Sequence, residues 1–305
     1  MKIEYLICHH NDADGLMSAI NMYYYLKNNK NIDSDKIKFE AVNYNSNYSY
    51  LKKYKKINKV YILDFFDKKL ISKLENKTDS IEVYDHHLST LEIMNKYRHP
   101  KVTIYCTDRT IGACEFIYNI LKINHDNLYK FTKAISTWDV WNKSDINYFF
   151  NSCWPLKIYF ETINNPVSLY TLITSLSYEE ILNQAKLMST VETTRIYKVS
   201  KNYFISYLYV NKQKYKVACL NSDIRSSLVY ELATRDGIIN DLSPDIIMHF
   251  NHIKPDKIAV SIYSKSGVNV LKIAKHFGGG GHVAAAGFEA KNIIFSNNII
   301  TIETR

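Results

Sequence analysis

The 305-residue sequence has few cysteines and arginines, no long apolar run, no internal repeat and no low-complexity tract. Its five cysteines are odd in number and scattered without a CxxC pair, which indicates reduced thiols and neither a disulfide framework nor a zinc knuckle. A membrane-spanning helix needs about 20 consecutive apolar residues, which the chain lacks. No signal-peptide or transit segment precedes the first expected strand at residues 2–8, so we expect a cytoplasmic protein without membrane contact.

The basic residues are mostly lysine: of 39 lysines and arginines, only six are arginine, and the formal net charge is +9. Such a charge favours a polyanionic partner, for example a nucleic acid. However, the chain is also rich in asparagine, isoleucine and tyrosine, whose codons are AT-rich like those of lysine. Genome composition is therefore an equally good explanation of the charge, and charge alone does not decide between the two.

Strand and helix patterns alternate in the first part of the chain, and the length fits two domains. Alternation of this kind predicts a mainly parallel, doubly wound α/β sheet. The expected strands are residues 2–8, 39–42, 59–66, 81–84 and 102–106, and the expected helices are 16–26, 111–121 and 127–137.

The pattern at residues 178–201 predicts one long, polar helix that connects two domains. A second, smaller α/β series follows it, so we expect domains at 1–177 and 202–305. The elements expected in this series are a hairpin of 203–210 and 214–220, a helix at 226–234, strands at 245–251 and 257–263, and a helix at 271–276.

The tripeptide Asp85-His86-His87 ends an apolar, β-prone run. In open α/β sheets, ligands bind at the carboxyl ends of the strands. His10, Asp12 and Asp14 alternate in the loop after the first expected strand, from which all three can point to one place. Carboxylate and imidazole together suit Mn²⁺ or Mg²⁺, with Mn²⁺ favoured by histidine. The spacing leaves open whether His9 replaces His10, and whether the segment is only an Asp-Gly turn with an N-capping aspartate.

Two further acids stand at the ends of expected elements. Asp64 closes the apolar run 60–63, and Asp139 lies between two tryptophans, which would partly desolvate its carboxylate. Each acid could instead cap a helix, and Asp64 could pair with a lysine. Asp67 is expected to cap a helix at 68–74.

Four consecutive glycines, Gly278–Gly281, precede His282, three alanines and Gly287. Backbone N–H groups in such a run can approach a ligand without obstruction, and a following helix would add a positive dipole for phosphate. The small residues would allow close packing against a sheet. A flexible hinge is the alternative.

In this order along the chain, the motifs resemble those of the DHH phosphoesterase superfamily, in the branch with a C-terminal DHHA1 domain. This branch includes RecJ-type exonucleases, nanoRNase/pAp phosphatases and cyclic-dinucleotide phosphodiesterases. The matching residues are His10-x-Asp12-x-Asp14-Gly15, Asp64, Asp85-His86-His87, Asp139, and Gly279–His282 with Ala285–Gly287. One departure is Tyr263, which stands where many relatives have an arginine; Lys265 could replace that arginine only as a point charge.

The resemblance implies a DHH domain joined by the long helix to a DHHA1 domain, and two divalent ions, Mn²⁺ or Mg²⁺. It implies that Asp85 orients His86, that His87 contacts the scissile phosphate or completes a metal shell, and that Asp64 bridges the ions. The implied ligands are His10, Asp12, Asp14, Asp64, His86 and Asp139, and the implied substrate-binding residues are Gly279, Gly280, Gly281, His282 and Lys265.

The chain carries neither the additional nucleic-acid-binding domain of RecJ-type enzymes nor sensory modules, so we expect short substrates. The first hypothesis is hydrolysis of short single-stranded oligonucleotides to mononucleotides. The second is the same chemistry on cyclic or linear dinucleotides or pAp. The third is an inactive scaffold that binds nucleic acid or protein. A homodimer is left open.

Overall fold

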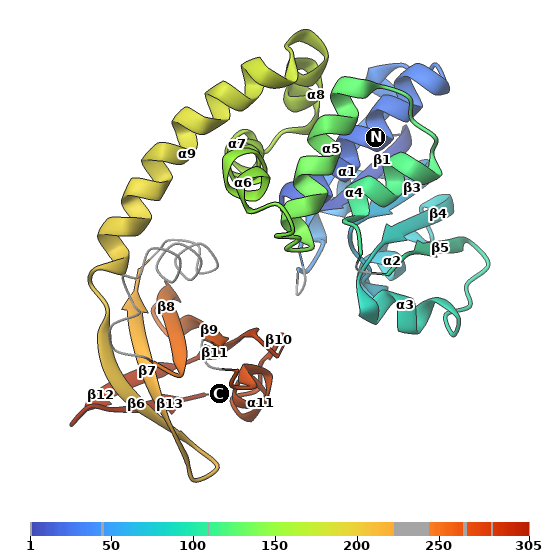
Figure 1. The fold of residues 1–305 in the computed structure, drawn as a ribbon. Helices are drawn as coiled ribbons and strands as arrows, with labels where there is room; N and C mark the ends of the chain where they lie inside the picture. The colour runs from blue at the N-terminus through green and yellow to red at the C-terminus, as the bar shows by residue number, and fades with distance from the viewer. Residues whose placement is uncertain are drawn as a thin grey trace. The chain divides into compact units, whose positions relative to one another are not determined.

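The computed structural model of the chain describes residues 2–43, 46–108, 110–222, 244–264, 267–281 and 283–304. These residues form two compact units, Met1–Ser189 and Thr190–Arg305. The boundary falls within the long helix α9 (Tyr178–Ser200), whose range agrees with the predicted helix (Figure 1). No helix among the described residues has the length and apolar character needed to cross a bilayer. Each unit is described by itself below.

The N-terminal unit is built on a five-stranded, fully parallel sheet with the order β2-β1-β3-β4-β5. The parallel sheet that the alternating pattern predicted is therefore confirmed. Because the strands are parallel, residues that follow them come to one common edge. The strands are β1 (Lys2–His10), β2 (Ile37–Val42), β3 (Lys56–Leu63), β4 (Thr78–Asp85) and β5 (Val102–Cys106).

Helices cover the two faces of this sheet (Figure 1). On one face, α2 (Lys68–Leu74) and α3 (Leu88–Met94) contribute apolar side chains to a core with β1, β3 and β4. On the other, α1 (Ala13–Tyr24) packs against β1, α4 (Ala113–Ile120) and α5 (Asp126–Asp139). The sheet is thus doubly wound, as expected. Burial of apolar surface on both faces explains the nearly continuous apolar runs in its strands.

Short helices complete the N-terminal unit. The region 142–177, for which the sequence analysis named no element, is largely helical, and prolines lie in the first turns of two of its helices. The additional elements are η1 (Tyr25–Asn29), η2 (Ser34–Lys36), η3 (Ser49–Lys53), α6 (Ile146–Tyr148), η4 (Phe149–Cys153), α7 (Trp154–Ile163) and α8 (Pro166–Ser175).

The C-terminal unit contains an eight-stranded sheet with the order β10-β11-β9-β8-β7-β6-β13-β12. Its pairings are antiparallel except β7 with β8 and β13 with β6. The predicted hairpin is confirmed, and the predicted helix at 226–234 lies outside the described residues. The elements are β6 (Phe204–Val210), β7 (Gln213–Asn221), β8 (Ile246–Lys254), β9 (Lys257–Ser264), α11 (Val270–His276), β10 (Gly280–Gly281), β11 (Ala285–Ala290), β12 (Asn292–Ser296) and β13 (Ile299–Glu303).

The glycine run follows α11 and its last two residues form β10, so within the described residues it does not lead into a helix whose dipole could contribute to a phosphate site. The small residues serve strand pairing instead, because β11 pairs with both β9 and β10. A Cβ at Gly279 would lie 2.1 Å from the carbonyl oxygen of Gly287, and one at Gly287 would lie 2.8 Å from that of Val260. The expected close packing is therefore confirmed at these positions. Lys265 and His282 lie outside the described residues.

Candidate metal centre

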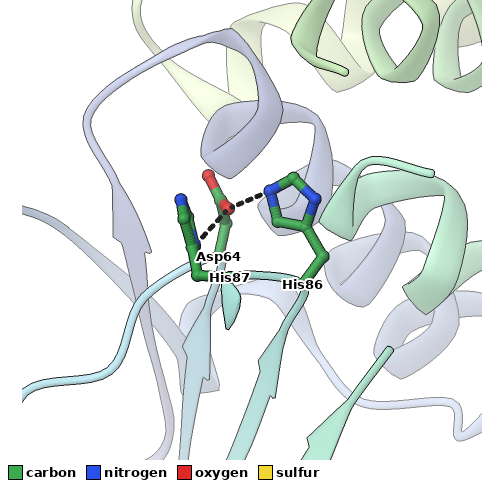
Figure 2. A group of neighbouring side chains, drawn as sticks. All are labelled: Asp64, His86 and His87. Atoms are coloured by element: carbon green, nitrogen blue, oxygen red, sulfur yellow. Dashed lines mark ion pairs between the residues drawn. The ribbon is translucent and has the colours of Figure 1, made fainter. Parts of the chain in front are cut away.

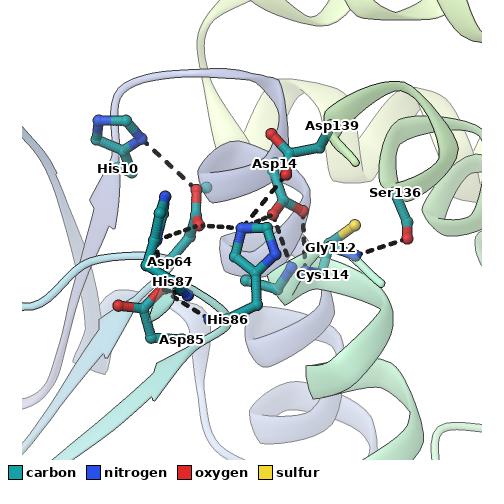
Figure 3. Close-up of polar contacts among 12 residues, drawn as sticks. His10, Asp14, Asp64, Asp85, His86, His87, Gly112, Cys114, Ser136 and Asp139 are labelled. Atoms are coloured by element: carbon teal, nitrogen blue, oxygen red, sulfur yellow. Dashed lines mark hydrogen bonds and ion pairs between the residues drawn. The ribbon is translucent and has the colours of Figure 1, made fainter. Parts of the chain in front are cut away.

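Acids and imidazoles gather at the carboxyl edge of the parallel sheet (Figure 3). His10 ends β1, Asp64 directly follows β3, and Asp85-His86-His87 ends and follows β4. Asp139, far away in sequence, reaches the same place as the last residue of α5. Three groups, each with ligand atoms within 4.8 Å of one another, could hold a metal ion; they are Asp64, His86 and His87; His10, Asp12 and Asp64; and Asp14, His86 and Asp139.

Asp64 lies between the rings of His86 and His87 (Figure 2). Its Oδ1 is 3.4 Å from His86 Nε2 and 3.8 Å from His87 Nδ1, whereas its Oδ2 is 3.6 Å from His10 Nδ1. The residue is buried, and its φ of 56° is left-handed, a conformation that aspartate tolerates better than most residues. Its N–H donates to the Tyr84 carbonyl, which continues the β3–β4 ladder by one residue. The two oxygens of one carboxylate therefore face different ligand groups.

His86 presents one ring nitrogen to the cluster and is anchored by the other. Its Nδ1 lies 3.0 Å from the Ile111 carbonyl, which can only accept, so Nδ1 carries a proton and donates. Its Nε2 faces Asp14 Oδ2 at 3.7 Å and Asp139 Oδ2 at 3.3 Å. Fixing one nitrogen by a backbone carbonyl is the common way to orient a metal-binding imidazole.

Asp14 is held by the N-terminus of α4. Its Oδ2 accepts the N–H of Ala113 at 2.7 Å and its Oδ1 that of Cys114 at 2.9 Å, so one carboxylate uses two unpaired donors of the first turn. Gly112 precedes them, and a Cβ there would lie 3.0 Å from Asp14 Oδ1. Glycine at 112 therefore lets α4 approach the carboxylate.

Asp85 contacts the His86 main chain and the His87 ring, but not the His86 ring, which differs from its expected role. Its Oδ1 accepts the His86 N–H at 2.8 Å and lies 2.6 Å from His87 Nδ1. Its Oδ2 accepts the Thr90 hydroxyl at 2.5 Å. Asp85 thus fixes the His87 ring, and the Ile111 carbonyl fixes the His86 ring.

His10 and Asp12 form an ion pair on the other side of Asp64. His10 Nδ1 lies 2.6 Å from Asp12 Oδ2, and Asp12 also caps α1 by accepting the Gly15 N–H. The N-capping aspartate that the sequence left unassigned is therefore Asp12, and this role coexists with its place in the cluster. His9 is buried, and its Nδ1 lies 2.8 Å from the His10 carbonyl; it belongs to none of the three groups. Among the described residues, the geometry favours His10 over His9.

At His86 and His10, neighbouring carboxylates raise the pKa by more than burial lowers it. Burial alone would lower the pKa of His86, but Asp64, Asp14 and Asp139 raise it to about 10. Burial also disfavours the charged form of His10, yet Asp12 and Asp64 raise its pKa to about 11. Both imidazoles therefore hold a proton near neutral pH when no metal is bound.

Two acids of the cluster, Asp14 and Asp139, also have raised pKa values. Burial first, and then the charges of Asp14 and Asp64, raise the pKa of Asp139 well above its usual value. Burial and Asp64 raise the pKa of Asp14 to about 6. So much negative charge in one buried place is costly without cations. A bound metal would displace these protons, since ligands bind deprotonated.

Three buried atoms at the centre of the cluster make no hydrogen bond with any described residue: Asp64 Oδ1, His86 Nε2 and Asp139 Oδ2. Buried polar groups nearly always have a partner. These three point into the same small space, with His86 Nε2 within 3.3–3.4 Å of both oxygens. Oxygen and imidazole donors in this arrangement fit a divalent cation such as Mn²⁺.

A cavity of about 170 Å³ adjoins the cluster and is lined by Asp12, Ala13, Asp14, Ile135, Trp138, Asp139, Lys157 and Glu161. The sequence analysis missed Lys157 and Glu161, which α7 places in the wall. Lys157 is buried, 2.8 Å from Glu161 and 5.9 Å from the Trp138 ring centre. In the sequence, only their i, i+4 spacing could have indicated that the two residues contact each other. The same spacing is typical of many exposed helical pairs, so it does not indicate a cavity.

Profiles of two protein families match the sequence, and together they cover most of it. The N-terminal domain of the DHH family matches residues 4–138, and the DHHA1 domain matches residues 211–302. The chain therefore belongs to the DHH family of phosphoesterases, in the branch with a DHHA1 domain, as the motifs indicated. No curated protein matches the sequence.

Several solved structures have folds similar to that of this chain. The pGpG-specific phosphodiesterase PggH of Vibrio cholerae has a TM-score of 0.53 and 16% identity, over 94% of this chain and 92% of PggH. RecJ of Thermus thermophilus, in complex with Mn²⁺, has a TM-score of 0.54 and 14% identity, over 93% of this chain but 49% of RecJ. An exopolyphosphatase-related protein of Bacteroides fragilis has a TM-score of 0.51 and 15% identity, over 96% of this chain and 88% of that one. At these identities the likeness concerns the fold.

Proposed function

We propose that the protein is a metal-dependent phosphodiesterase that hydrolyses short single-stranded oligonucleotides to mononucleotides. The observation that carries this proposal is the convergence of three buried metal-ligating atoms, which make no hydrogen bond with any described residue, on one space beside a second acid–imidazole group. A scaffold without catalytic activity has no need for this arrangement, because clustered buried carboxylates destabilise a fold unless cations accompany them.

Two ion sites would share Asp64. His10, Asp12 and Asp64 Oδ2 would hold one ion, and the other ligands would hold the second; these are Asp14, His86, Asp139 and Asp64 Oδ1. A bound pair of divalent ions, Mn²⁺ or Mg²⁺, supplies an activated water and stabilises charge on a phosphoryl group.

His87 is the chain's own candidate for contact with the scissile phosphate. Its side chain is 28% exposed, whereas Asp85, which holds its Nδ1, is fully buried. Burial would lower the pKa of His87, but the Asp85 carboxylate raises it above its usual value, which favours the cationic form of the imidazole. A fixed, cationic imidazole at the edge of the cluster would bind a phosphate oxygen and position it.

Substrate contacts in the C-terminal unit are proposed at Gly279–Gly281, with His282 and Lys265. A Cβ at Gly280 would meet nothing within 4 Å, so its backbone is open to a ligand. Tyr263, in place of the family arginine, is buried and pairs with Ala285 in the β9–β11 ladder. It would not supply a bidentate phosphate contact.

Cyclic or linear dinucleotides, or pAp, are the second candidate substrates. The observation in their favour is that fold similarity to a pGpG phosphodiesterase extends over nearly the whole of both chains, but over only half of RecJ. A chain of this size suits a substrate of a few nucleotides.

The test is an assay with Mn²⁺ on four substrates: an end-labelled dinucleotide, an oligonucleotide of about 24 nucleotides, cyclic di-AMP and pAp. We expect turnover of the dinucleotide and shortening of the longer strand. Turnover of only cyclic di-AMP or pAp would support the second candidate. Absence of product from all four, in protein shown to bind Mn²⁺, would leave the scaffold hypothesis.

A further inference from the structure

A cavity of about 400 Å³ lies between η3 and α2, and it shares no lining residue with the metal centre. Three lysines, two asparagines and two serines dominate its wall, and none of its described lining residues is acidic. We call this cavity the lysine groove; its lining residues are Asn47, Tyr48, Ser49, Leu51, Lys52, Ser72, Lys73, Asn76 and Lys77.

The three lysines of the groove, Lys52, Lys73 and Lys77, form no ion pair with an acidic side chain among the described residues, so their charge can attract an anionic ligand. Nearby acids are engaged elsewhere: Glu40 with Lys53, and Glu75 with His99. Lys77 is fixed, because its ammonium donates to the Leu51 carbonyl at 2.8 Å, whereas Lys52 and Lys73 are exposed.

The groove lies at the amino edge of the sheet, because η3 leads into β3 and the residues from Ser72 to Lys77 lead into β4. The Tyr48 hydroxyl donates to Asp67 Oδ2 at 2.7 Å, and Asp67 lies three residues after Asp64. Lys77 directly precedes β4, so it lies at the amino edge of the sheet. The groove and the metal centre therefore belong to one unit but lie at opposite edges of its sheet.

The chemistry of the lining indicates phosphate and sugar as the ligand. Ammonium, amide and hydroxyl groups bind phosphate oxygens without reading bases. The aromatic ring, Tyr48, is 1% exposed and is not available for base stacking. We propose that the lysine groove binds the sugar–phosphate backbone of single-stranded nucleic acid, at a site separate from the metal centre. The proposal rests on the proposed function only in treating that strand as a substrate.

The test compares two double variants in fluorescence anisotropy with a labelled oligonucleotide of about 12 nucleotides. EDTA prevents hydrolysis, so the outcome does not depend on catalysis. In Lys52→Gln/Lys73→Gln, we expect affinity to fall about tenfold. The slope of log Kd against log salt should fall by about 1.4, since each single-strand phosphate contact contributes about 0.7. Lys77 is left unchanged because it supports the η3 main chain.

The matched control is Lys122→Gln/Lys130→Gln, two exposed lysines that do not line the groove and carry the same charge change. We expect it to retain the affinity and salt slope of the unaltered protein. Equal losses in both double variants would overturn the proposal, because they would show that general charge binds the strand. Thermal unfolding of both variants checks that the fold is intact.

A competition experiment separates nucleic acid from an acidic protein surface. Unlabelled oligonucleotide should displace the labelled strand at much lower concentration than polyglutamate of equal charge. Equal displacement would overturn the assignment to nucleic acid. Oligonucleotide binding that depends on the groove, in a protein that hydrolyses nothing, would contradict the proposed function and leave this inference standing.

Discussion

The two units of the chain present their candidate binding groups in opposite ways. In the N-terminal unit, side chains from four distant segments are buried together, and main-chain groups hold them in place. In the C-terminal unit, the glycine segment offers main-chain groups, and its small residues permit close strand pairing. The first arrangement depends on charge and on the orientation of side chains, and the second on the absence of side chains. The two should therefore fail for different kinds of substitution.

The largest effect is expected from Asp64→Asn. This substitution keeps the shape of the side chain but removes the charge that two ligand groups share. We expect turnover to fall by more than about 100-fold, because even partners outside a metal's ligand shell contribute 10- to 100-fold. Calorimetry with Mn²⁺ should show weaker binding at both sites.

The control for this substitution is Asp67→Asn. Asp67 lies three residues later, accepts the Lys69 N–H and the Tyr48 hydroxyl, and caps α2. An asparagine can still cap, so we expect turnover within about twofold and a stability loss below about 1 kcal/mol. Equal losses of turnover in the two variants would show that Asp64 acts through the fold and not through metal.

The gathering of acids and imidazoles at this edge of the sheet could be predicted from the sequence because one rule of topology was sufficient. Parallel strands bring their carboxyl ends to one edge, so His10, Asp64 and Asp85 could be placed together once the strands were recognised. The rule did not give the hydrogen-bond partners at that edge. Whether the Asp85 carboxylate reaches the ring of His86 or of His87 depends on side-chain torsions and on the Ile111 carbonyl, which no sequence pattern specifies.

Two other features were beyond sequence reasoning for different reasons. A run of glycines has no strong preference for helix or strand, so the direction of the chain after Gly281 was set by pairing with β9, a long-range contact. Lys157 and Glu161 form an i, i+4 pair whose spacing is the same in the wall of a cavity as on an exposed surface. Only the packing of α7 distinguishes the two cases.

A smaller effect is expected from Asp85→Asn, which acts through His87. An asparagine amide offers one acceptor oxygen where the carboxylate serves the His86 N–H, the His87 ring and the Thr90 hydroxyl. We expect turnover to fall about 10- to 100-fold while Mn²⁺ affinity changes little. The measurements are kcat with saturating Mn²⁺ and calorimetry. A loss of metal binding as large as in Asp64→Asn would contradict a positioning role.

Metal should stabilise the N-terminal unit in particular. Mn²⁺ at about 100 times its Kd should add about 2.7 kcal/mol to the free energy of unfolding. All three tryptophans, Trp138, Trp141 and Trp154, belong to this unit, so their fluorescence reports its unfolding alone. Addition of EDTA should lower the tryptophan-detected melting temperature. If the metal-free protein and the same protein reloaded with Mn²⁺ have equal melting temperatures, the assigned ligands do not bind the metal.

The smallest of these effects is expected from Gly279→Ala. This substitution tests whether the C-terminal unit depends on the absence of side chains in its glycine segment. The added methyl group would lie 2.1 Å from the Gly287 carbonyl oxygen. Because this oxygen belongs to the main chain, it can give way only if the segment at Gly279 and β11 move apart. Overpacking of this kind costs about 1–3 kcal/mol. Gly280→Ala is the matched control, since its Cβ would meet nothing within 4 Å among the described residues. Urea unfolding followed by circular dichroism should show the loss in the first variant only, while the tryptophan-detected transition stays in place. Equal stability of the two variants would mean that the close approach at Gly279 does not hold this segment together.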